Sequence, residues 1–334
     1  MYEVDFLAVE PDGKSGDAIT VRFSTPGGGQ AVIVIDSGFT DIGSDIGSHV
    51  RGWYHTNHID LAINTHPDAD HLNGLATVLE EMTVEELLIH QPRQHGYHQD
   101  EVNPEALDDL LALARRRRVP IVEPFAGLQR FDGALTVLGP TEGYYEQMLK
   151  EQVSGPSLTA AAASFLRKAL VRTRRVLGTL PPETLDNTGE TTPRNNSSVI
   201  TQVHVDGRRL LFTGDAGTPA LSNALDYSDL YGLGDAPLAF LDVPHHGSRR
   251  NLGPDMLDRL LAGQTGVTAY VSASHSDPKH PSPKVTNALL RRGCQVYTTE
   301  DGGKWHHHGT PARAGWWPAR PLPPLDETDD DEDS

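Results

Sequence analysis

The stretch Thr65-His66-Pro67-Asp68-Ala69-Asp70-His71 is the most informative part of this chain. It follows an apolar run at 59–63, which predicts a buried strand, and it precedes a glycine-containing helix start at 72–75. The stretch is therefore predicted to be a strand-to-helix loop, where rigid elements can hold ligands without enclosing them. Imidazole and carboxylate groups suit zinc and neighbouring divalent metals. The close spacing predicts two ions, one bound by His66 and Asp68 and the other by Asp70 and His71.

The pattern His-x-Asp-x-Asp-His resembles the signature of the metallo-β-lactamase superfamily, whose commonest form has histidine where this chain has Asp68. The aspartate form resembles the branch that contains the soluble hydrolase domain of ComEC-type competence proteins and the phosphorylcholine esterases. Further matches, between about residues 3 and 305, follow in the expected order: Gly-Asp-Ala-Ile at 16–19, Ile-Asp-Ser-Gly at 35–38, Asn-Asn-Ser-Ser at 195–198, Phe-Thr-Gly-Asp at 212–215, Val-Pro-His-His-Gly-Ser at 243–248 and Lys-His-Pro-Ser at 279–282.

Two departures limit what this resemblance implies. Many superfamily members have a third-motif histidine near the position of Asn196, so the first metal has fewer protein ligands here. ComEC-type proteins also carry a large membrane channel, and no apolar run in this chain approaches the length of a membrane span. A role in DNA uptake is therefore not expected.

The resemblance assigns the remaining metal ligands. Asp215 ends a strand after a glycine and is expected to bridge the two ions with its two oxygens. His246 is expected to bind the second ion with Asp70, His71 and Asp215. His245 is assigned a catalytic role over the site, in contact with a phosphoryl oxygen. Adjacent residues on an extended strand face opposite ways, so the reverse assignment of the two histidines stays open.

Other residues are expected to assist catalysis. Asp70 is placed among the catalytic residues as well as the ligands. His280 would bind substrate or donate a proton to the leaving group, although a structural loop histidine is the alternative. Asn196 and Ser248 are candidates for substrate contacts. Asp36 would orient a metal-binding histidine, since such histidines need a carboxylate or carbonyl partner.

Strand and helix patterns alternate in two halves, which predicts an α/β four-layer αββα sandwich of the metallo-β-lactamase type. One hydrolase domain is expected over residues 1–317, with a helical cap insertion at 141–194 that includes a helix at 158–177. The bases of the cap, residues 167, 168, 172, 174 and 175, are either a face for a phosphate-bearing substrate or ordinary exposed bases. Residues 318–334 are expected to form an acidic, disordered tail. The trio at 306–308 is expected to be a solvated loop.

Composition limits the location and the partners. The chain has 334 residues, one cysteine and a formal charge of −18, and residues 326–334 contribute seven of the negative charges, which leaves −11 elsewhere. A protein with this negative charge repels nucleic acid unless bound metals or a local basic patch offset the charge. The charge therefore argues against a protein that coats nucleic acid non-specifically, but it is consistent with a metal-dependent nuclease. The N-terminus does not resemble a signal peptide, and a cytoplasmic location without a membrane partner fits. The acidic tail could contact a protein partner.

These features predict a metal-dependent hydrolase with two divalent ions, zinc in the first place and manganese as a second choice. The ions would share a water and lower its pKa for attack on a phosphodiester, in a nucleic acid or a smaller phosphorylated molecule. Oxygen-rich ligation through Asp68 suits hard phosphate oxygens. The alternatives are a lactonase or thioesterase on the same fold, and a degenerate fold that acts as an interaction module.

Overall fold

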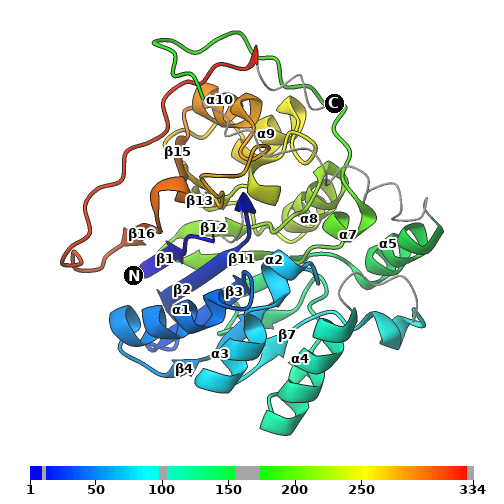
Figure 1. Ribbon diagram of the computed structural model, residues 1–334. Helices are drawn as coiled ribbons and strands as arrows, with labels where there is room; N and C mark the ends of the chain where they lie inside the picture. The colour runs from blue at the N-terminus through cyan, green and yellow to red at the C-terminus, as the bar shows by residue number, and fades with distance from the viewer. Residues whose placement is uncertain (10–12, 98–103, 155–173, 329–334) are drawn as a thin grey trace.

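Two sheets packed face to face form the centre of the molecule. The computed structural model describes residues 1–9, 13–97, 104–154 and 174–328. In these residues each large sheet has seven strands, and helices cover the outer face of each sheet (Figure 1). The layer order helix, sheet, sheet, helix confirms the predicted four-layer sandwich.

The first sheet has the order β16-β1-β2-β3-β5-β7-β8, antiparallel from β16 to β3 and parallel from β3 to β8. Its strands are β1 (Tyr2–Phe6), β2 (Ala18–Ser24), β3 (Gln30–Ser37), β5 (Leu61–Ile63), β7 (Leu87–Leu88), β8 (Ile121–Val122) and β16 (Lys304–His308). Its outer helices are α1 (Ile42–His49), α3 (Leu75–Glu81) and α4 (Pro104–Arg117). The α4 helix begins at a proline and ends on arginines, which complement the helix dipole, as the sequence predicts.

The second sheet has the order β15-β14-β13-β12-β11-β10-β9 and is parallel from β12 to β15. Its strands are β9 (Gln129–Arg130), β10 (Leu135–Gly139), β11 (Ile200–Val205), β12 (Arg208–Phe212), β13 (Leu238–Asp242), β14 (Thr268–Val271) and β15 (Gln295–Thr298). Its outer helices are α8 (Thr218–Leu230), α9 (Pro254–Leu261) and α10 (Pro283–Arg291). The predicted turn between β11 and β12 is present, since Asp206 and Gly207 have φ of 51° and 69°.

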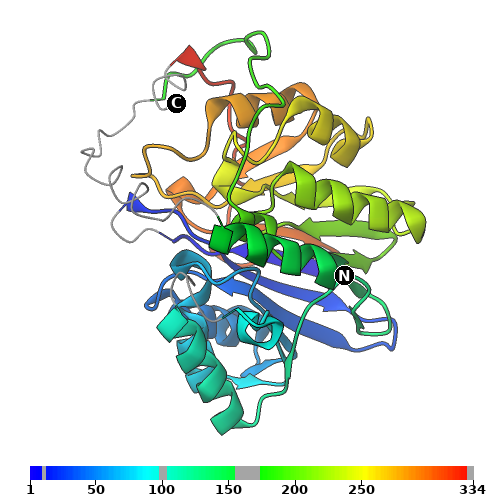
Figure 2. The same cartoon turned by 90° about the vertical axis from the view of Figure 1, so that its right-hand side faces the viewer.

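Short elements connect these layers. They are η2 (Val50–Tyr54), α2 (Ala69–Leu72), η3 (Pro92–His95), α5 (Glu142–Ser154), α7 (Pro193–Asn196), η5 (His245–Gly247), η6 (Thr299–Asp301) and a small sheet of β4 (His58–Ile59) and β6 (Thr83–Val84). The side view shows α5 lying across the molecule between the two groups of outer helices (Figure 2). None of the described helices is long and apolar enough to cross a membrane.

Three apolar layers hold the sandwich together. The central layer lies between the sheets, where Phe6 and Phe212 each pack against Phe240, with ring centroids 5.7 Å apart in both pairs. The two outer layers join each sheet to its helices. Each fully buried phenylalanine contributes about 1.5–3 kcal/mol relative to an exposed one. The packing fixes both sheets rigidly, so the loops at their ends are held at defined positions.

The C-terminal histidine trio is a correction to the sequence prediction. His306, His307 and His308 lie in β16, which pairs with β1, and do not form a solvated loop. The His306 ring stacks on Phe240 at 5.3 Å, and burial lowers its pKa to about 4. The loop prediction was wrong because β16 pairs with a strand about 300 residues earlier, and no local pattern reports such a partner.

The segment 322–328 also differs from the expected disordered tail. Leu325 is only 4% exposed and exchanges two hydrogen bonds with the Asn287 side chain. The carboxylate of Glu327 accepts hydrogen bonds from Asn287 and Arg291. This part of the acidic region is ordered because α10 supplies polar partners for it. Most of the predicted helix at 158–177, with residues 167, 168 and 172 of the cap, lies outside the described residues.

Candidate metal centre

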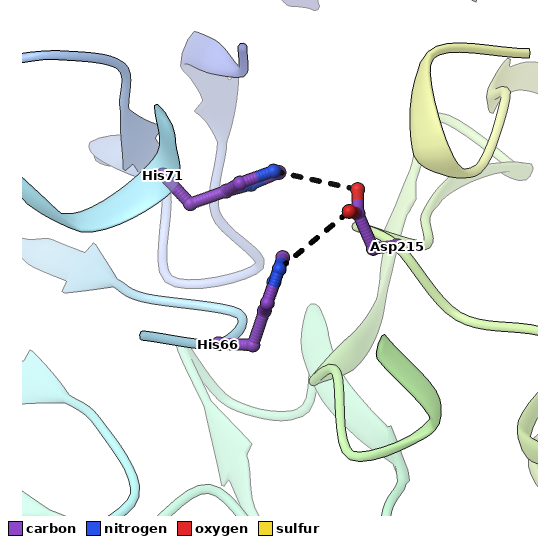
Figure 3. A group of neighbouring side chains, drawn as sticks. All are labelled: His66, His71 and Asp215. Carbon is purple, nitrogen blue, oxygen red and sulfur yellow. Dashed lines mark ion pairs between the residues drawn. The ribbon is translucent and has the colours of Figure 1, made fainter. Parts of the chain in front are cut away.

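The candidate site lies where the carboxyl ends of strands from both sheets meet, the usual position of ligand sites in parallel sheets. His66 and His71 follow β5 of the first sheet, whereas Asp215 follows β12 of the second. Figure 3 shows the two histidines pointing at different oxygens of Asp215. His66 Nε2 lies 3.5 Å from Asp215 Oδ2, and His71 Nε2 lies 3.4 Å from Asp215 Oδ1. One carboxylate thus faces ligands on two sides.

The first pocket consists of His66, Asp68, His245 and Oδ2 of Asp215. His66 Nε2 lies 3.7 Å from Asp68 Oδ2. His245 Nε2 lies 3.4 Å from Asp215 Oδ2, the oxygen that His66 also faces. Two imidazole nitrogens therefore face the same Asp215 oxygen, and Asp68 Oδ2 lies near one of them.

The second pocket consists of Asp70, His71, His246 and Oδ1 of Asp215. His246 Nε2 lies 3.7 Å from Asp70 Oδ2, and His71 Nε2 lies 4.0 Å from the same oxygen. The ligand atoms of Asp70, His71 and His246 all lie within 4.8 Å of one another. This pocket therefore offers the same donor set as the first, two imidazole nitrogens and two carboxylate oxygens.

The residues fit a pair of divalent ions. The Nε2 atoms of His66, His71 and His246 and the Oδ1 atom of Asp215 are buried and have no hydrogen-bond partner among the described residues. Buried polar atoms without partners are rare, because leaving them unsatisfied is unfavourable. Ligand atoms about 2.0–2.2 Å from a tetrahedral zinc ion lie roughly 3.3–3.5 Å from one another, close to the spacings found here.

Carboxylates support the second pocket from behind. Asp36 Oδ2 accepts a hydrogen bond from His71 Nδ1 at 2.7 Å, which turns His71 Nε2 towards the pocket. Asp17 lies 3.6 Å from His246 Nδ1 and 3.7 Å from His71 Nδ1. Burial opposes positive charge on His246, but Asp17 and Asp70 outweigh it and raise its pKa to about 9. The second pocket therefore attracts cations, protons included.

Neutral groups support the first pocket. Thr65 and Ser198 hydroxyls lie 3.1 and 3.4 Å from His66 Nδ1. His245 Nδ1 lies 2.8 Å from Asn251 Oδ1 and 3.1 Å from the Asn195 amide nitrogen. Burial lowers the pKa of His245 to about 4, so its imidazole is neutral at physiological pH. A neutral imidazole can use Nε2 as a metal ligand.

The backbone at His245 and His246 differs from the extended strand assumed from the sequence. Both residues have left-handed conformations, with φ of 49° and 54°, and they lie in the short helix η5. Both Nε2 atoms consequently face the site, one towards each pocket. Gly247 permits this turn, because a Cβ there would lie 2.8 Å from Pro281 Cβ. Left-handed non-glycine residues are strained and tend to occur at functional sites.

His280 lies beside the pockets, as expected, with its ring centroid 5.4 Å from that of His245 and 5.8 Å from that of His246. Its Nδ1 lies 3.1 Å from Asp277 Oδ2, and the Ser15 hydroxyl donates to the same oxygen at 2.7 Å. Asp277 therefore fixes the orientation of His280 and leaves Nε2 available for other contacts.

Of the two predicted substrate-contact residues, Ser248 is engaged in local structure, whereas Asn196 Oδ1 is buried and has no hydrogen-bond partner among the described residues. Ser248 Oγ accepts a hydrogen bond from the Arg250 backbone N–H at 3.2 Å. Asn196 is buried, and its Oδ1 lies so close to Gly217 that a Cβ there would be 2.6 Å away. The amide that contacts a pocket histidine belongs to Asn195, the preceding residue. Asn196 and Ser248 remain predictions as substrate contacts.

Several supporting residues were missed in the sequence, among them Asp17, Arg194, Asn195, Asn251 and Asp277. Asp17 belongs to the Gly-Asp-Ala-Ile motif at 16–19, but the motif does not indicate which side chains Asp17 contacts. Arg194 Nη1 lies 2.5 Å from Asp68 Oδ1, although 126 residues separate them, so no local pattern could indicate the pair.

The site opens to solvent on the side of Asp68, which precedes α2, and of Asp70, which lies in α2. The side chains of Asp68 and Asp70 are 27% and 30% exposed, whereas the other ligands of the second pocket are almost fully buried. A small cavity of about 10 Å³ lies beside His66, between that residue and Tyr145 of α5. The two aspartates are the most exposed residues of the two pockets.

No family model matches the chain, and no curated protein matches it. Among solved structures, it is similar to a diphosphatase from the PhnP family, with 14% identity and a TM-score of 0.39 over 92% of this chain and 98% of that one. It is also similar to a long-form RNase Z from yeast, with 9% identity and a TM-score of 0.37 over 89% of this chain and 37% of that one.

A third similar structure is a metallo-β-lactamase with a HARLDQ motif from Cronobacter sakazakii, with 16% identity and a TM-score of 0.31. That match covers 64% of this chain and 63% of the Cronobacter protein, so the chain spans less than two thirds of that length. The names of these three proteins differ in what they act on. The function of this chain is therefore argued from its own residues.

Proposed function

We propose that this chain is a two-metal hydrolase that acts on phosphodiesters. The observation that carries the proposal is the carboxylate of Asp215, whose two oxygens each face a separate group of imidazole and carboxylate donors. Four donor atoms of the two pockets are buried and have no hydrogen-bond partner within the described part of the chain, which suits a role as metal ligands. Zinc fits the mixed nitrogen and oxygen donors, and manganese is the second candidate.

Each residue of the two pockets has a proposed role. His66, Asp68 and His245 hold the first ion, whereas Asp70, His71 and His246 hold the second. His245 is thus proposed as a ligand in place of the missing third-motif histidine, because its Nε2 faces the same Asp215 oxygen as His66. This revises the phosphoryl contact expected from the sequence.

Two bound ions would lower the pKa of a shared water and stabilise negative charge on the reacting group. His280 is the proposed proton donor for the leaving group. Asp277 holds its Nδ1, so Nε2 faces away from that carboxylate and is free to meet a leaving oxygen. Burial of His66, His71 and His246 excludes bulk water from the back of the site, and the partly exposed aspartates leave the front open.

Phosphodiesters fit this site better than neutral esters. Three carboxylates take part in the pockets, and such oxygen-rich ligation suits ions that bind hard phosphate oxygens. A cationic side chain, Arg194, also lies beside the open first pocket. A nucleic acid and a smaller phosphorylated molecule both remain within the proposal, and the resemblance to the ComEC-type branch stays a prediction.

The test is a substrate panel on protein depleted of metal and then loaded with zinc or with manganese. We expect hydrolysis of bis(p-nitrophenyl) phosphate that requires added metal and is lost in Asp70→Ala. A nucleic-acid substrate and a lactone and thioester pair complete the panel. Turnover of the lactone or thioester alone would contradict the phosphodiester proposal, and a chain that binds no ions would contradict the enzyme proposal altogether.

The matched control is Asp226→Ala. Asp226 is exposed on α8, where it pairs with Arg259, so its removal should leave metal content unchanged. Circular dichroism on both variants separates loss of folding from loss of the site. Full turnover by a folded Asp70→Ala variant would exclude the assignment of the second pocket.

A further inference from the structure

Arg194 is a half-buried cation beside the first pocket. It projects from α7, and its side chain is 13% exposed. Its Nη1 donates to Asp68 Oδ1 at 2.5 Å, while Asp68 Oδ2 faces His66 across the pocket. The guanidinium is therefore one carboxylate away from the proposed first ion, on the side of the site that opens to solvent.

The guanidinium has hydrogen-bonding capacity beyond Asp68. An arginine carries five N–H donors in a planar fork. The Nε of Arg194 is buried and has no hydrogen-bond partner among the described residues. A buried donor without an acceptor is unfavourable, so an acceptor is expected at this position. The free donor is the part of the site that the metal ligands leave unexplained.

The charge around the first pocket favours an anionic acceptor. With no ion bound, Arg194 pairs with Oδ1 of Asp68, and His66 faces Oδ2 of the same carboxylate. A bound divalent ion would balance the charge of this carboxylate through Oδ2. The charge of Arg194 would then be available to a further anion.

We propose that Arg194 binds a non-bridging phosphoryl oxygen of the substrate, next to the first pocket, while it holds Asp68 in place. The substrate class is accordingly an anionic phosphate ester, since a neutral lactone or thioester has no charge for this side chain to balance. Arginine suits the role because its planar fork can contact a carboxylate and a phosphate oxygen at once. This inference rests on the proposed two-ion site.

The test measures binding of inorganic phosphate to the zinc-loaded protein by calorimetry, which does not depend on turnover. We expect Arg194→Gln to bind phosphate about 10-fold or more weakly than the unchanged chain, because a hydrogen bond to a charged group is worth about 1.5–3 kcal/mol. Arg194→Lys should recover part of the affinity, since it keeps the charge but not the fork. Zinc content is measured on each variant.

The control is Arg130→Gln, since Arg130 pairs with Glu86 at a distance from the site and its loss should leave phosphate binding unchanged. Phosphate binding that is equal in Arg194→Gln and the unchanged chain, with two zinc ions in both, would overturn the inference. Loss of the first zinc ion in both Arg194 variants would also overturn it, because Arg194 would then act only by positioning Asp68.

This result is separable from the proposed function. If phosphate binding depends on Arg194 but no phosphodiester is cleaved, the inference holds and the proposed activity fails. If phosphodiesters are cleaved and Arg194→Gln changes neither phosphate affinity nor KM, the activity holds and the inference fails.

Discussion

The two pockets share Asp215 but are supported by opposite kinds of residue. Behind the second pocket lie the buried carboxylates Asp17 and Asp36, which contact the histidine nitrogens that face away from the pocket. Around the first pocket lie the hydroxyl of Ser198, the amide of Asn195 and the cation Arg194. Equal donor sets thus sit in unequal electrostatic surroundings.

The residues around each pocket, rather than its ligands, therefore determine how strongly the pocket attracts protons and metal ions. Nearby carboxylates raise the pKa of His71 well above its usual value against the effect of burial, and they raise that of His246 to about 9. Burial lowers the pKa of His245 to about 4. Protons therefore compete with metal in the second pocket and not at His245 in the first.

The largest effect is expected from Asp215→Asn, which changes the one residue common to both pockets. The variant should lose affinity for both ions by more than ~100-fold, since loss of a supporting residue alone typically costs ~10–100-fold. Metal content after gel filtration, measured by mass spectrometry, checks this result. Asp206→Asn in the β11–β12 turn is the control, because asparagine also tolerates a positive φ. If the Asp215→Asn variant kept both ions, the proposed bridging role of Asp215 would be excluded.

Much of this architecture could be predicted from local patterns. The turn at Asp206-Gly207 depends on neighbours within a few residues, and it was predicted. The predicted loop at 65–71 is present only to Asp68, because α2 begins at Ala69. The positions of β16 and Arg194 depend on partners far along the chain, and neither was predicted. The sequence motif therefore named the proposed ligands of the second pocket more completely than the residues that support either pocket.

The orientation of His245 shows a second limit. Its left-handed φ of 49° depends on a turn that Gly247 makes against Pro281, so an alternating strand pattern misplaced one of the two adjacent histidines. The sequence has Asn196 where many superfamily members have a metal-binding histidine, but it does not indicate which residue could take the place of that ligand. His245 is the candidate, because its Nε2 lies 3.4 Å from Asp215 Oδ2.

The next effect separates the pockets. Asp36→Asn removes the charge behind His71 while asparagine still tolerates the φ of 54° at this position. The affinity of the second ion should fall ~10–100-fold and that of the first should fall less, because Asp36 supports His66 only indirectly, by accepting hydrogen bonds from the Thr65 hydroxyl and backbone N–H. Stepwise titration against a chelating dye resolves the two ions. Loss of the first ion ahead of the second would contradict the division of roles proposed for the two pockets.

A third prediction concerns pH. Below a raised pKa the imidazole carries a proton in the metal-free chain, so an ion that enters the second pocket must displace protons from His71 and His246. Its affinity should therefore rise with pH up to about 9, the pKa of His246, by about tenfold per pH unit for each proton displaced.

Binding to the first pocket should displace no proton from His245 above about pH 4, the pKa of that residue. Calorimetry in two buffers of different ionisation enthalpy counts the protons released with each ion. Equal proton release by both ions at neutral pH would show that the surroundings of the two pockets do not differ in the way inferred here.

The smallest effect is expected from Ser198→Ala, the first-pocket counterpart of Asp36→Asn. The Ser198 hydroxyl lies 3.4 Å from His66 Nδ1, and the Thr65 hydroxyl lies closer, at 3.1 Å, so one support remains when the other is removed. A neutral hydrogen bond is worth about 0.5–1.5 kcal/mol, which corresponds to a roughly 2–10-fold loss of affinity for the first ion. The second ion should weaken less, because Ser198 Oγ supports the shared Asp215 only through its backbone N–H, at 3.2 Å. The same dye titration measures it. A loss as large as that of Asp36→Asn would mean that a neutral hydroxyl holds its histidine as strongly as a carboxylate does. The two pockets would then differ only in charge, and the count of released protons tests that difference separately.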